Sequence, residues 1–468
     1  MRWLPGAAPL TRLWRRGKLP EPAHWHRFSE GFAMLRPFTV LLLAGGSFLA
    51  AQGTGIRLFF HLSYILLALL ALSVIWAWLN LRGLDLERET LTHRATVGEY
   101  ARERIGIRNR WPLPKLWVEL RDQSELPQHG AGFVASLAGR ERGRWMARTL
   151  CTQRGRFRLG PATLISGDPF GIVRLSRTVQ STSEILVYPR TVDLPDFRLP
   201  SAELPGGQAT RSRSFNITPN VSTVRDYAPG DSMNRIHWRS TARTGRLMVK
   251  EFELDPSADV YLVLDMQERT VVRDTRALQA ARAEEDERDR GPWWTRKPSE
   301  RRDHAIELAS TEEYAVMATA SLARALLTQN RVVGLVAWGQ HREVIPAERE
   351  SRQLFKILEA LAVLRAHSAR SLAEVLTAES QRFGRNCTLV IITSSLDERW
   401  IGALQQHLYR GVRAAVLFVD PQSFGGWRDP EPTLRRLAEL RVPTYRLRQG
   451  QPLPEALREP LGLNAIAA

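Results

Sequence analysis

Two uncharged stretches near the start of the chain decide its architecture: they read FTVLLLAGGSFLAAQGTGI over residues 38–56 and FFHLSYILLALLALSVIWAWL over residues 59–79. An α-helix needs roughly 20 apolar residues to cross the hydrocarbon core of a bilayer, and each stretch is about that long. A signal peptide followed by one span is disfavoured, because the basic region of residues 1–36 is long and contains four prolines. We therefore predict a transmembrane hairpin over residues 37–82, preceded by a basic tail of residues 1–36.

The basic residues that flank the hairpin predict its orientation. Seven Lys and Arg precede the first stretch, Arg57 alone lies in the connector, and Arg82, Arg88 and Arg94 follow the second stretch. Loops rich in Lys and Arg remain on the cytoplasmic side of a membrane. Both termini, and the whole of the chain after the hairpin, are therefore predicted to lie in the cytoplasm.

The net charge of +17 over 468 residues first suggests a nucleic-acid-binding protein. Thirteen of these seventeen excess charges fall within residues 1–200, however, close to the predicted membrane segment. We therefore expect no nucleic-acid partner, since such proteins concentrate their charge in a basic groove or patch. Only two cysteines, Cys151 and Cys387, are present, which excludes a disulfide framework and a cysteine-rich zinc module.

Residues 83–200 carry short runs of alternating polar and apolar residues, separated by Gly, Pro and Asn. Period-two runs at such spacing predict an antiparallel β-sandwich or barrel. The expected strands include residues 84–88, 101–107, 117–120, 156–159 and 185–188. The excess basic residues here fit either a solvated strand face or contact with an anionic membrane surface, and the pattern leaves both open.

Residues 260–450 predict an α/β domain, and residues 451–468 a C-terminal tail. Near-continuous apolar strands alternate with helical patterns, which is typical of a mostly parallel, doubly wound sheet. Ligands of such sheets bind beyond the carboxyl ends of the strands, where this chain carries Asp265, Thr393-Ser394-Ser395 and Asp420. The expected strands are 260–265, 332–338, 342–346, 388–393, 414–420 and 444–447, and the expected helices are 311–327, 352–364, 372–383, 398–409 and 432–440.

The segment 201–259 between these two parts contains a dense motif, whose residues are Tyr227, Pro229, Gly230, Asp231, Arg235, His237, Trp238 and Arg243. Pro-Gly-Asp is a strong turn signal, and Asp231 or Ser232 is expected to cap a short helix through Ile236 and Trp238. The motif contains no phosphate-binding loop, nucleophile elbow or paired metal ligands. His237 is therefore expected to be a packed or hydrogen-bonded histidine, because a catalytic base needs a nucleophile within reach.

The motif resembles the signature of the domain of unknown function fifty-eight family. Agreement extends to Arg154-Gly155, Leu159-Gly160-Pro161, Asp168-Pro169-Phe170-Gly171 and Val187-Tyr188-Pro189. The resemblance covers roughly residues 38–420 and implies a bacterial inner-membrane protein with a von Willebrand factor A-like domain. It also implies an assembly or chaperone-like role beside a MoxR-type AAA+ ATPase.

Von Willebrand factor A domains hold a metal through Asp-x-Ser-x-Ser after the first strand. This chain keeps Asp265 but has Gln267 and Arg269 at the two serine positions. A cationic side chain opposes a divalent ion, which prefers oxygen ligands. We therefore expect a degraded metal site around Asp265 and no bound metal or other cofactor.

A charged insertion follows the first strand of the α/β domain, at residues 269–303, where 18 of 35 residues are charged. Its composition favours a solvated, partly helical or disordered segment. The alternative is a docking lobe anchored by Trp293 and Trp294, because exposed tryptophans are frequent hot spots of interfaces.

These observations together favour a membrane-anchored, non-enzymatic protein with a membrane hairpin, a β-sandwich-like segment and a von Willebrand factor A-like domain. We expect it to present that domain to a MoxR-type AAA+ ATPase or to a client of the ATPase. No small-molecule substrate is indicated. The alternative is a membrane-associated hydrolase or transferase that uses Asp231 and His237.

Overall fold

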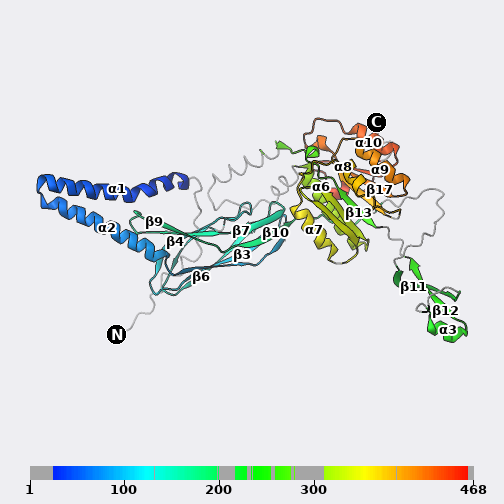
Figure 1. Cartoon of the computed structure of the whole chain (residues 1–468), viewed down its shortest axis with the longest axis horizontal. Helices are drawn as coiled ribbons and strands as arrows, with labels where there is room; N and C mark the ends of the chain where they lie inside the picture. Colours follow the sequence, from blue (N-terminus) through cyan, green and yellow to red (C-terminus); the bar gives the residue numbers. More distant parts are fainter. Residues whose placement is uncertain are drawn as a thin grey trace, which may run out of the picture. The chain divides into compact units, whose positions relative to one another are not determined.

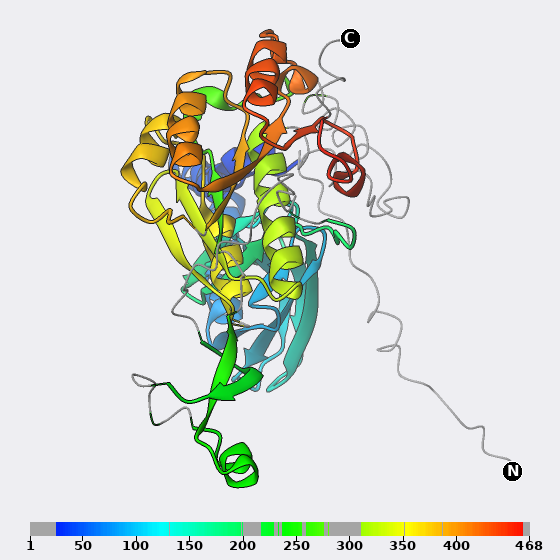
Figure 2. The same ribbon diagram turned by 90° about the vertical axis from the view of Figure 1, so that its right-hand side faces the viewer.

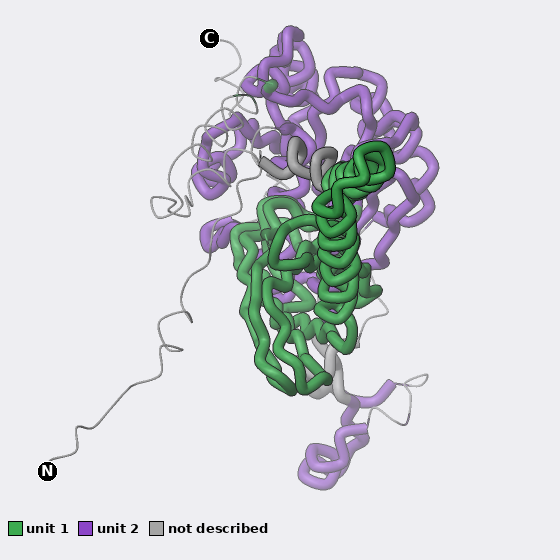
Figure 3. The backbone as a smooth tube through the Cα atoms, turned by 90° about the vertical axis from the view of Figure 1, so that its left-hand side faces the viewer, with its two compact units in different colours: residues 1–190, 275–307, 361–363 green, residues 191–274, 308–360, 364–468 purple. Residues whose placement is uncertain are grey.

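The computed structural model describes residues 25–197 (except 131) and 199, residues 217–228, 233, 236–254, 259–275 and 279, and residues 310–461 (except 351 and 386). The chain divides into two compact units (Figure 3). One comprises residues 1–190, 275–307 and 361–363, and the other comprises residues 191–274, 308–360 and 364–468. Pro229, Gly230, Asp231, Arg235, Trp293 and Trp294 lie outside the described residues.

Two antiparallel helices, α1 (Trp25–Thr54) and α2 (Arg57–Leu81), begin the described chain (Figure 1). Small residues lie where the helices meet: Ala44 and Ala51 are buried, and the Ser47 hydroxyl donates to the Phe59 carbonyl at 2.9 Å. The large side chains point outward, and Leu58 is 71% exposed. As predicted, the helical stretches 35–54 and 57–81 are long and apolar enough to cross a membrane. A core helix of a soluble protein would instead bury its large apolar side chains.

The β-rich segment follows α2 directly and contains three small sheets (Figure 1). Their strand orders are β1-β3-β6, β2-β10-β7 and β5-β4-β8-β9. All the strand pairs are antiparallel except β2 with β10. The strands are β1 (Leu84–Thr90), β2 (Arg94–Thr96), β3 (Tyr100–Asn109), β4 (Lys115–Asp122), β5 (Phe133–Leu137), β6 (Arg142–Leu150), β7 (Gly155–Leu159), β8 (Ala162–Gly167), β9 (Arg174–Val179) and β10 (Ser183–Tyr188).

Alternation along these strands builds the core of the segment. Ile105 and Ile107 of β3 pack with Val118 and Leu120 of β4 and with Leu164 of β8, so two sheets face each other across one apolar cluster. Side chains at successive positions of a strand point to opposite faces, and the intervening residues of β3 are mostly polar. The predicted β-rich character is confirmed.

The central segment forms a two-stranded antiparallel sheet of β11 (Ile217–Asp226) and β12 (Met248–Leu254), with the short helix α3 (Trp238–Thr244) between them. The predicted helix through Ile236 is wrong. Ile236 pairs with Val249 in a β-bridge and is buried, so its backbone is extended and the helix starts after it. Gly245 ends the helix at φ 67°, in the left-handed region that favours glycine.

The α/β domain contains a six-stranded sheet with the order β15-β14-β13-β16-β17-β18, in which the edge strand β15 is antiparallel. The predicted mostly parallel sheet is therefore confirmed. The strands are β13 (Val260–Leu264), β14 (Val333–Trp338), β15 (Arg342–Glu348), β16 (Thr388–Thr393), β17 (Arg413–Val419) and β18 (Thr444–Leu447). The helices are α6 (Thr311–Thr328), α7 (Gln353–Val363), α8 (Leu372–Ala378), α9 (Arg399–Tyr409), α10 (Glu431–Glu439) and α11 (Leu453–Ala456), with short 3₁₀ turns η3 (Glu268–Thr270) and η5 (Pro421–Phe424).

Helices cover both faces of this sheet. Residues of α8, α9 and α10 join Val263, Leu389 and Ile391 in one apolar cluster. The alternate residues Leu262 and Val390 are equally buried, and the long helix α6 crosses their side of the sheet (Figure 2, yellow-green). The predicted helix over residues 372–383 is shorter than expected, because α8 ends at Ala378.

Residues 451–461 belong to the segment predicted as a C-terminal tail, but they pack on the α/β domain. The Tyr314 hydroxyl donates to the Gln451 carbonyl, and the Leu461 N–H donates to the Thr444 carbonyl, both at 2.7 Å. Leu453 and Leu457 are buried.

Candidate functional site

The carboxyl edge of the six-stranded sheet brings Asp265 and Thr393 together. Asp265 follows β13, and Thr393 ends β16, the neighbouring parallel strand. The strand order reverses between these two strands, which is where open α/β sheets bind ligands. The Thr393 hydroxyl donates to Asp265 Oδ2 at 2.7 Å, and the Gln267 N–H donates to Oδ1 at 3.1 Å. Burial raises the pKa of Asp265, and these two hydrogen bonds partly oppose the rise.

The other polar residues of this edge are held by neighbouring protein groups. The Ser394 hydroxyl donates to the Thr270 carbonyl at 2.9 Å, and the Ser395 N–H donates to the Thr393 hydroxyl oxygen. Asp397 pairs with Arg399, whose hydrogen bonds and charge lower the pKa of that carboxyl.

Asp420, at the end of β17, is buried beside Arg446 of β18. The Arg446 guanidinium donates to Asp420 Oδ2 from Nε at 3.0 Å and from Nη2 at 2.9 Å, and also to Glu431 at 2.7 Å. A charge-assisted pair of this kind fixes both side chains. Asp420 is therefore part of the fold at this edge.

The residues at this edge do not fit a divalent metal. Both Asp265 oxygens accept hydrogen bonds from protein donors. Gln267 and Arg269 stand at the positions where the pattern expected from the family resemblance has serine. Arg269 is exposed in η3, next to the edge. We therefore continue to predict that this edge binds no divalent metal.

A large exposed aromatic residue lies on the same edge. Trp427 follows η5 in the loop between β17 and α10, and 85% of its surface is exposed. The Arg428 guanidinium lies 4.9 Å from the centre of its ring. Tyr409, which is 82% exposed, ends α9 at the opposite edge, because α9 runs back from the carboxyl ends of the strands. Sequence reasoning missed Trp427, since burial cannot be read from a single aromatic residue in a loop.

The described residues of the signature motif form a hydrogen-bonded helix start. His237 Nδ1 lies 2.7 Å from the Ser240 hydroxyl and 3.2 Å from the Ser240 backbone nitrogen, so the imidazole caps α3. Trp238 is 67% exposed, Arg243 is exposed, and Tyr227 is half-buried. The cap predicted from Asp231 or Ser232 is replaced by His237, because α3 begins two residues after Ile236. The alternative enzyme site would need Asp231 beside His237, and Asp231 lies outside the described residues.

A cluster of four ionisable side chains, which the sequence did not reveal, is buried in the β-rich segment. It consists of Arg88, Glu103, Asp122 and His129, whose side chains are 1–3% exposed. Arg88 pairs with both carboxylates, with Nε 3.2 Å from Glu103. His129 Nε2 lies 2.9 Å from Asp122 and 3.3 Å from Glu103.

The electrostatics of this four-charge cluster favour a protonated histidine. Burial alone would lower the pKa of His129, but hydrogen bonds and charge from Asp122 and Glu103 raise it to about 9. Burial would raise the pKa of Asp122, but His129, Ser124 and Arg88 together lower it. Two cations then balance two anions. Glu103, Asp122 and His129 lie close enough to hold a metal ion, yet Arg88 already supplies a cation to both carboxylates.

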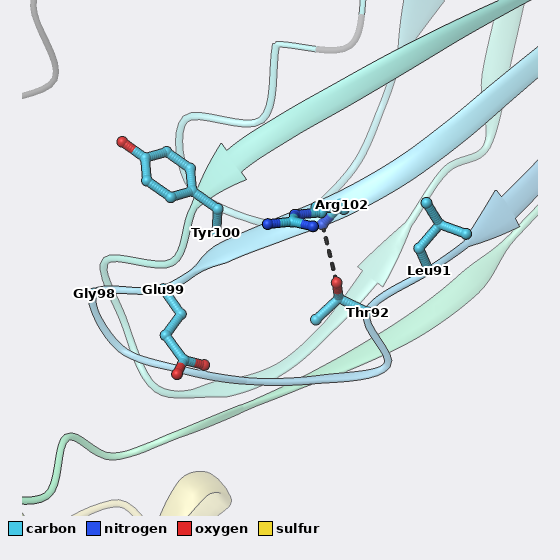
Figure 4. A pocket seen from close by; sticks show the side chains of 6 residues that line it. All are labelled: Leu91, Thr92, Gly98, Glu99, Tyr100 and Arg102. Atoms are coloured by element: carbon cyan, nitrogen blue, oxygen red, sulfur yellow. Dashed lines mark hydrogen bonds between the residues drawn. The ribbon is translucent and has the colours of Figure 1, made fainter.

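A cavity of about 580 Å³ lies in the β-rich segment (Figure 4). Its lining residues are Leu91, Thr92, Gly98, Glu99, Tyr100 and Arg102. The Arg102 N–H donates to the Thr92 hydroxyl oxygen at 3.3 Å, and the Glu99 carboxylate accepts from the Thr96 N–H at 2.8 Å. This lining pairs no nucleophile with a base, so we assign the cavity no chemistry.

Comparison with known proteins supports the family resemblance in part. The family described as "Protein of unknown function DUF58" matches residues 223–285. The uncharacterized protein YeaD of Bacillus subtilis (strain 168) is 20% identical over 371 residues, which are 77% of this chain and 82% of that protein. The predicted resemblance is thus confirmed for the segment that carries the signature motif.

Solved structures similar to this chain cover a small part of it. The CARDB domain of the PF1109 protein from Pyrococcus furiosus is 19% identical, covers 22% of this chain and 94% of that domain, and has a TM-score of 0.19. A β-glucosidase from Listeria innocua is 11% identical, covers 22% of this chain and 16% of that enzyme, and has a TM-score of 0.16.

Proposed function

We propose that the protein is a non-enzymatic membrane anchor that presents its α/β domain to a cytoplasmic partner, a MoxR-type AAA+ ATPase or the client of one. On this proposal the α/β domain is von Willebrand factor A-like, and the hairpin crosses the bacterial inner membrane twice with both termini in the cytoplasm. The family resemblance motivates the choice of partner, and the basic flanks of the hairpin motivate the orientation.

The observation that carries the proposal is the character of the carboxyl edge. Its polar residues form hydrogen bonds with one another. The Thr393 hydroxyl donates a hydrogen bond to Asp265, and the Arg446 guanidinium donates one to Asp420. Such an arrangement leaves little reactivity at the place where α/β proteins usually bind substrates. Trp427 meanwhile stands exposed on that edge, and tryptophan is among the residues that most often dominate binding energy at interfaces.

The alternative, a hydrolase or transferase built on Asp231 and His237, receives no support from the described residues. His237 uses Nδ1 to cap α3, bonding to Ser240. A general base would need that imidazole beside a nucleophile and an orienting group. An activity screen with membranes that contain His237→Ala protein would revive the alternative if a hydrolytic activity disappeared with the substitution.

The experiment that tests the proposal is affinity capture of the full chain from detergent extract, with nucleotide hydrolysis blocked to trap ATPase complexes. We expect an AAA+ ATPase among the captured proteins. Trp427→Ala should weaken the capture about thirtyfold, because an interface hot spot contributes roughly 2 kcal/mol. Tyr409→Ala is the matched control, an equally exposed aromatic residue at the opposite edge of the sheet, and it should leave capture unchanged.

Two outcomes count against the proposal. If no AAA+ ATPase is captured, the choice of partner is wrong. If the ATPase is captured equally well by the Trp427→Ala and Tyr409→Ala variants, the carboxyl edge is not the contact surface.

A further inference from the structure

We propose that the end of the β-rich segment beside the helical hairpin is a lipid-binding surface, which holds the headgroup of an anionic phospholipid between Trp76, Trp117 and Arg174. This inference rests on the membrane anchoring of the proposed function. It adds a direct contact between the soluble segment and the bilayer surface.

The last turn of α2 is hydrogen-bonded to the first residues of β4. Asn80 Nδ2 donates to the Leu116 carbonyl at 2.6 Å, and the Leu116 N–H donates to Asn80 Oδ1 at 3.3 Å. The Lys115 ammonium donates to the Leu79 carbonyl. Asn80 lies at the end of the membrane-crossing stretch 57–81. Leu116 and Trp117 therefore lie where that helix leaves the hydrocarbon core.

A second contact joins α1 to the same end of the segment. Arg36 lies at the start of the membrane-crossing stretch 35–54, and its Nη1 donates to the Gly171 carbonyl at 3.0 Å. Gly171 belongs to the Asp168-Pro169-Phe170-Gly171 turn between β8 and β9. Both ends of the hairpin are thus attached to neighbouring loops at one end of the segment.

The turn is built so that Phe170 faces outward. Asp168 Oδ1 accepts from the Val173 N–H at 2.6 Å, and Oδ2 accepts from the Phe170 N–H at 2.9 Å. Asp168 is buried, whereas 61% of Phe170 is exposed. The buried carboxylate therefore shapes the turn, and an aromatic ring stands at its tip.

Other large apolar side chains at this end are also exposed: Leu113, Leu116 and Trp117. Trp117 has φ 54°, a left-handed backbone that costs free energy for any residue except glycine and persists mainly where function requires it. Tryptophan and other aromatic rings concentrate at the headgroup level of membranes. Trp76 of α2 lines one cavity together with Trp117, and the Arg82 guanidinium lies 4.4 Å from the ring centre of Trp78.

A cavity of about 290 Å³ opens among these residues, and its lining includes Trp76, Leu116, Trp117, Arg174 and, from the turn, Asp168 and Gly171. This volume lies at the lower end of the range for small-molecule sites, enough for a headgroup, while acyl chains continue along the exposed face of α2.

The charges around the cavity favour an anion. The acidic lining residues are engaged: Asp168 accepts two N–H groups, and Glu119 pairs with Arg121 at 2.7 Å. Arg174 is exposed, and among the described residues no carboxylate pairs with it. Around the opening, Arg36, Arg121 and Arg174 outnumber the carboxylates of Glu119 and Asp168 by three to two. This net positive charge complements the phosphate of an anionic lipid.

Site-directed labelling of full-length protein in vesicles of phosphatidylglycerol and phosphatidylcholine tests the proposal. A polarity-sensitive fluorophore is attached at Phe170→Cys in the turn, at Leu67→Cys in α2, and at Tyr100→Cys at the far end of β3. Cys151 and Cys387 stay unlabelled, because both are buried and burial raises each thiol pKa to about 11.

We expect the labels at positions 67 and 170 to be blue-shifted and protected from an aqueous quencher, and the label at position 100 to be quenched. Protection at 67 with full quenching at 170 would overturn the lipid contact and leave the membrane anchor intact. Quenching at 67 would overturn the anchor itself, and the proposed function with it.

Native mass spectrometry of the purified protein tests the preference for anionic headgroups. The protein should retain phosphatidylglycerol over phosphatidylcholine, and Arg174→Gln should reduce that preference about fivefold, the value of one Arg near an anionic surface. Arg102→Gln, an exposed arginine on β3, is the control and should change nothing. Equal retention of the two lipids, or an equal loss in both variants, would overturn the headgroup assignment.

Discussion

Raising the pH should destabilise the β-rich segment by deprotonating His129. Its pKa is about 9 in the folded protein, against 6.5 ordinarily. A group whose pKa is raised by folding stabilises the folded state fully below its unfolded value, and this stabilisation is lost as pH rises through the folded value. The window for the loss therefore runs from about pH 6.5 to 9.

The size of the effect follows from the same two values. A difference of about 2.5 pKa units corresponds to roughly 3 kcal/mol of unfolding free energy. No discount for solvent screening is needed, because the His129 side chain is 2% exposed and its partners Asp122 and Glu103 are 1% and 3% exposed. If the segment opens reversibly, its open population should rise by up to about 300-fold across this window.

The two buried cysteines provide the assay. Cys151 lies in the core of the β-rich segment and Cys387 in the α/β domain. Full-length protein in detergent and moderate urea is pulsed with a thiol reagent at several pH values, and labelling at both cysteines is quantified by mass spectrometry. The ratio of Cys151 to Cys387 labelling removes the intrinsic pH dependence of thiol chemistry, because both buried thiols react only after their own region opens and then titrate as ordinary cysteines.

We expect this ratio to rise steeply between pH 6.5 and 9 in the wild-type chain. In His129→Gln the ratio should be high already at pH 6.5 and nearly constant above it, because no proton remains to be lost. A flat ratio in the wild-type chain would refute the assignment of a protonated His129 between Asp122 and Glu103.

Three further outcomes follow from other contacts. Thr393→Val removes the donor to Asp265 Oδ2 and should lower the unfolding free energy of the α/β domain by about 1.5–3 kcal/mol, measured by chemical denaturation. Gly160→Ala should increase Cys151 labelling at constant pH, because φ is 80° there and the added Cβ would lie 2.4 Å from the Ser181 carbonyl oxygen. Calorimetric titration with Mg²⁺ should show no tight binding, and tight binding abolished by Asp265→Ala would contradict the degraded metal site.

The regular elements of the fold follow from local patterns, so they were predictable. Residues 388–393 and 444–447 were predicted as strands and form β16 and β18. The helix predicted over residues 311–327 is α6, which begins at Thr311 with Ser310 as its N-cap. Apolar periodicity and capping residues act within a few positions of one another, and a single sequence contains both.

Sequence reasoning missed the four-charge cluster, although the alternation of core-facing and solvent-facing positions along the strands shows that three of its residues face the core. Three of the four charged residues lie at core-facing positions of their strands: Arg88 on the same side of β1 as Leu84, Glu103 on the same side of β3 as Ile105, and Asp122 on the same side of β4 as Leu120. A charged residue at a core-facing position must find a partner. The partners come from different strands and a loop, however, so their proximity depends on the pairing of strands far apart in sequence.

The carboxyl edge shows the same limit. Strand patterns placed Asp265, Thr393 and Asp420 on one edge, as the structure has them. The hydrogen bond between Thr393 and Asp265, and the pairing of Asp420 with Arg446, depend on which strands are neighbours. The exposure of Trp427 depends on the path of a loop, which carries no periodic pattern.

Photo-crosslinking in intact membranes tests the central claim most directly. A photoreactive amino acid is placed at position 427 on the carboxyl edge and, as control, at position 409 on the opposite edge, and crosslinked proteins are identified by mass spectrometry. The account predicts an AAA+ ATPase crosslinked from position 427 and absent from position 409. The absence of any ATPase crosslink from position 427, or an equal yield from both positions, would contradict it.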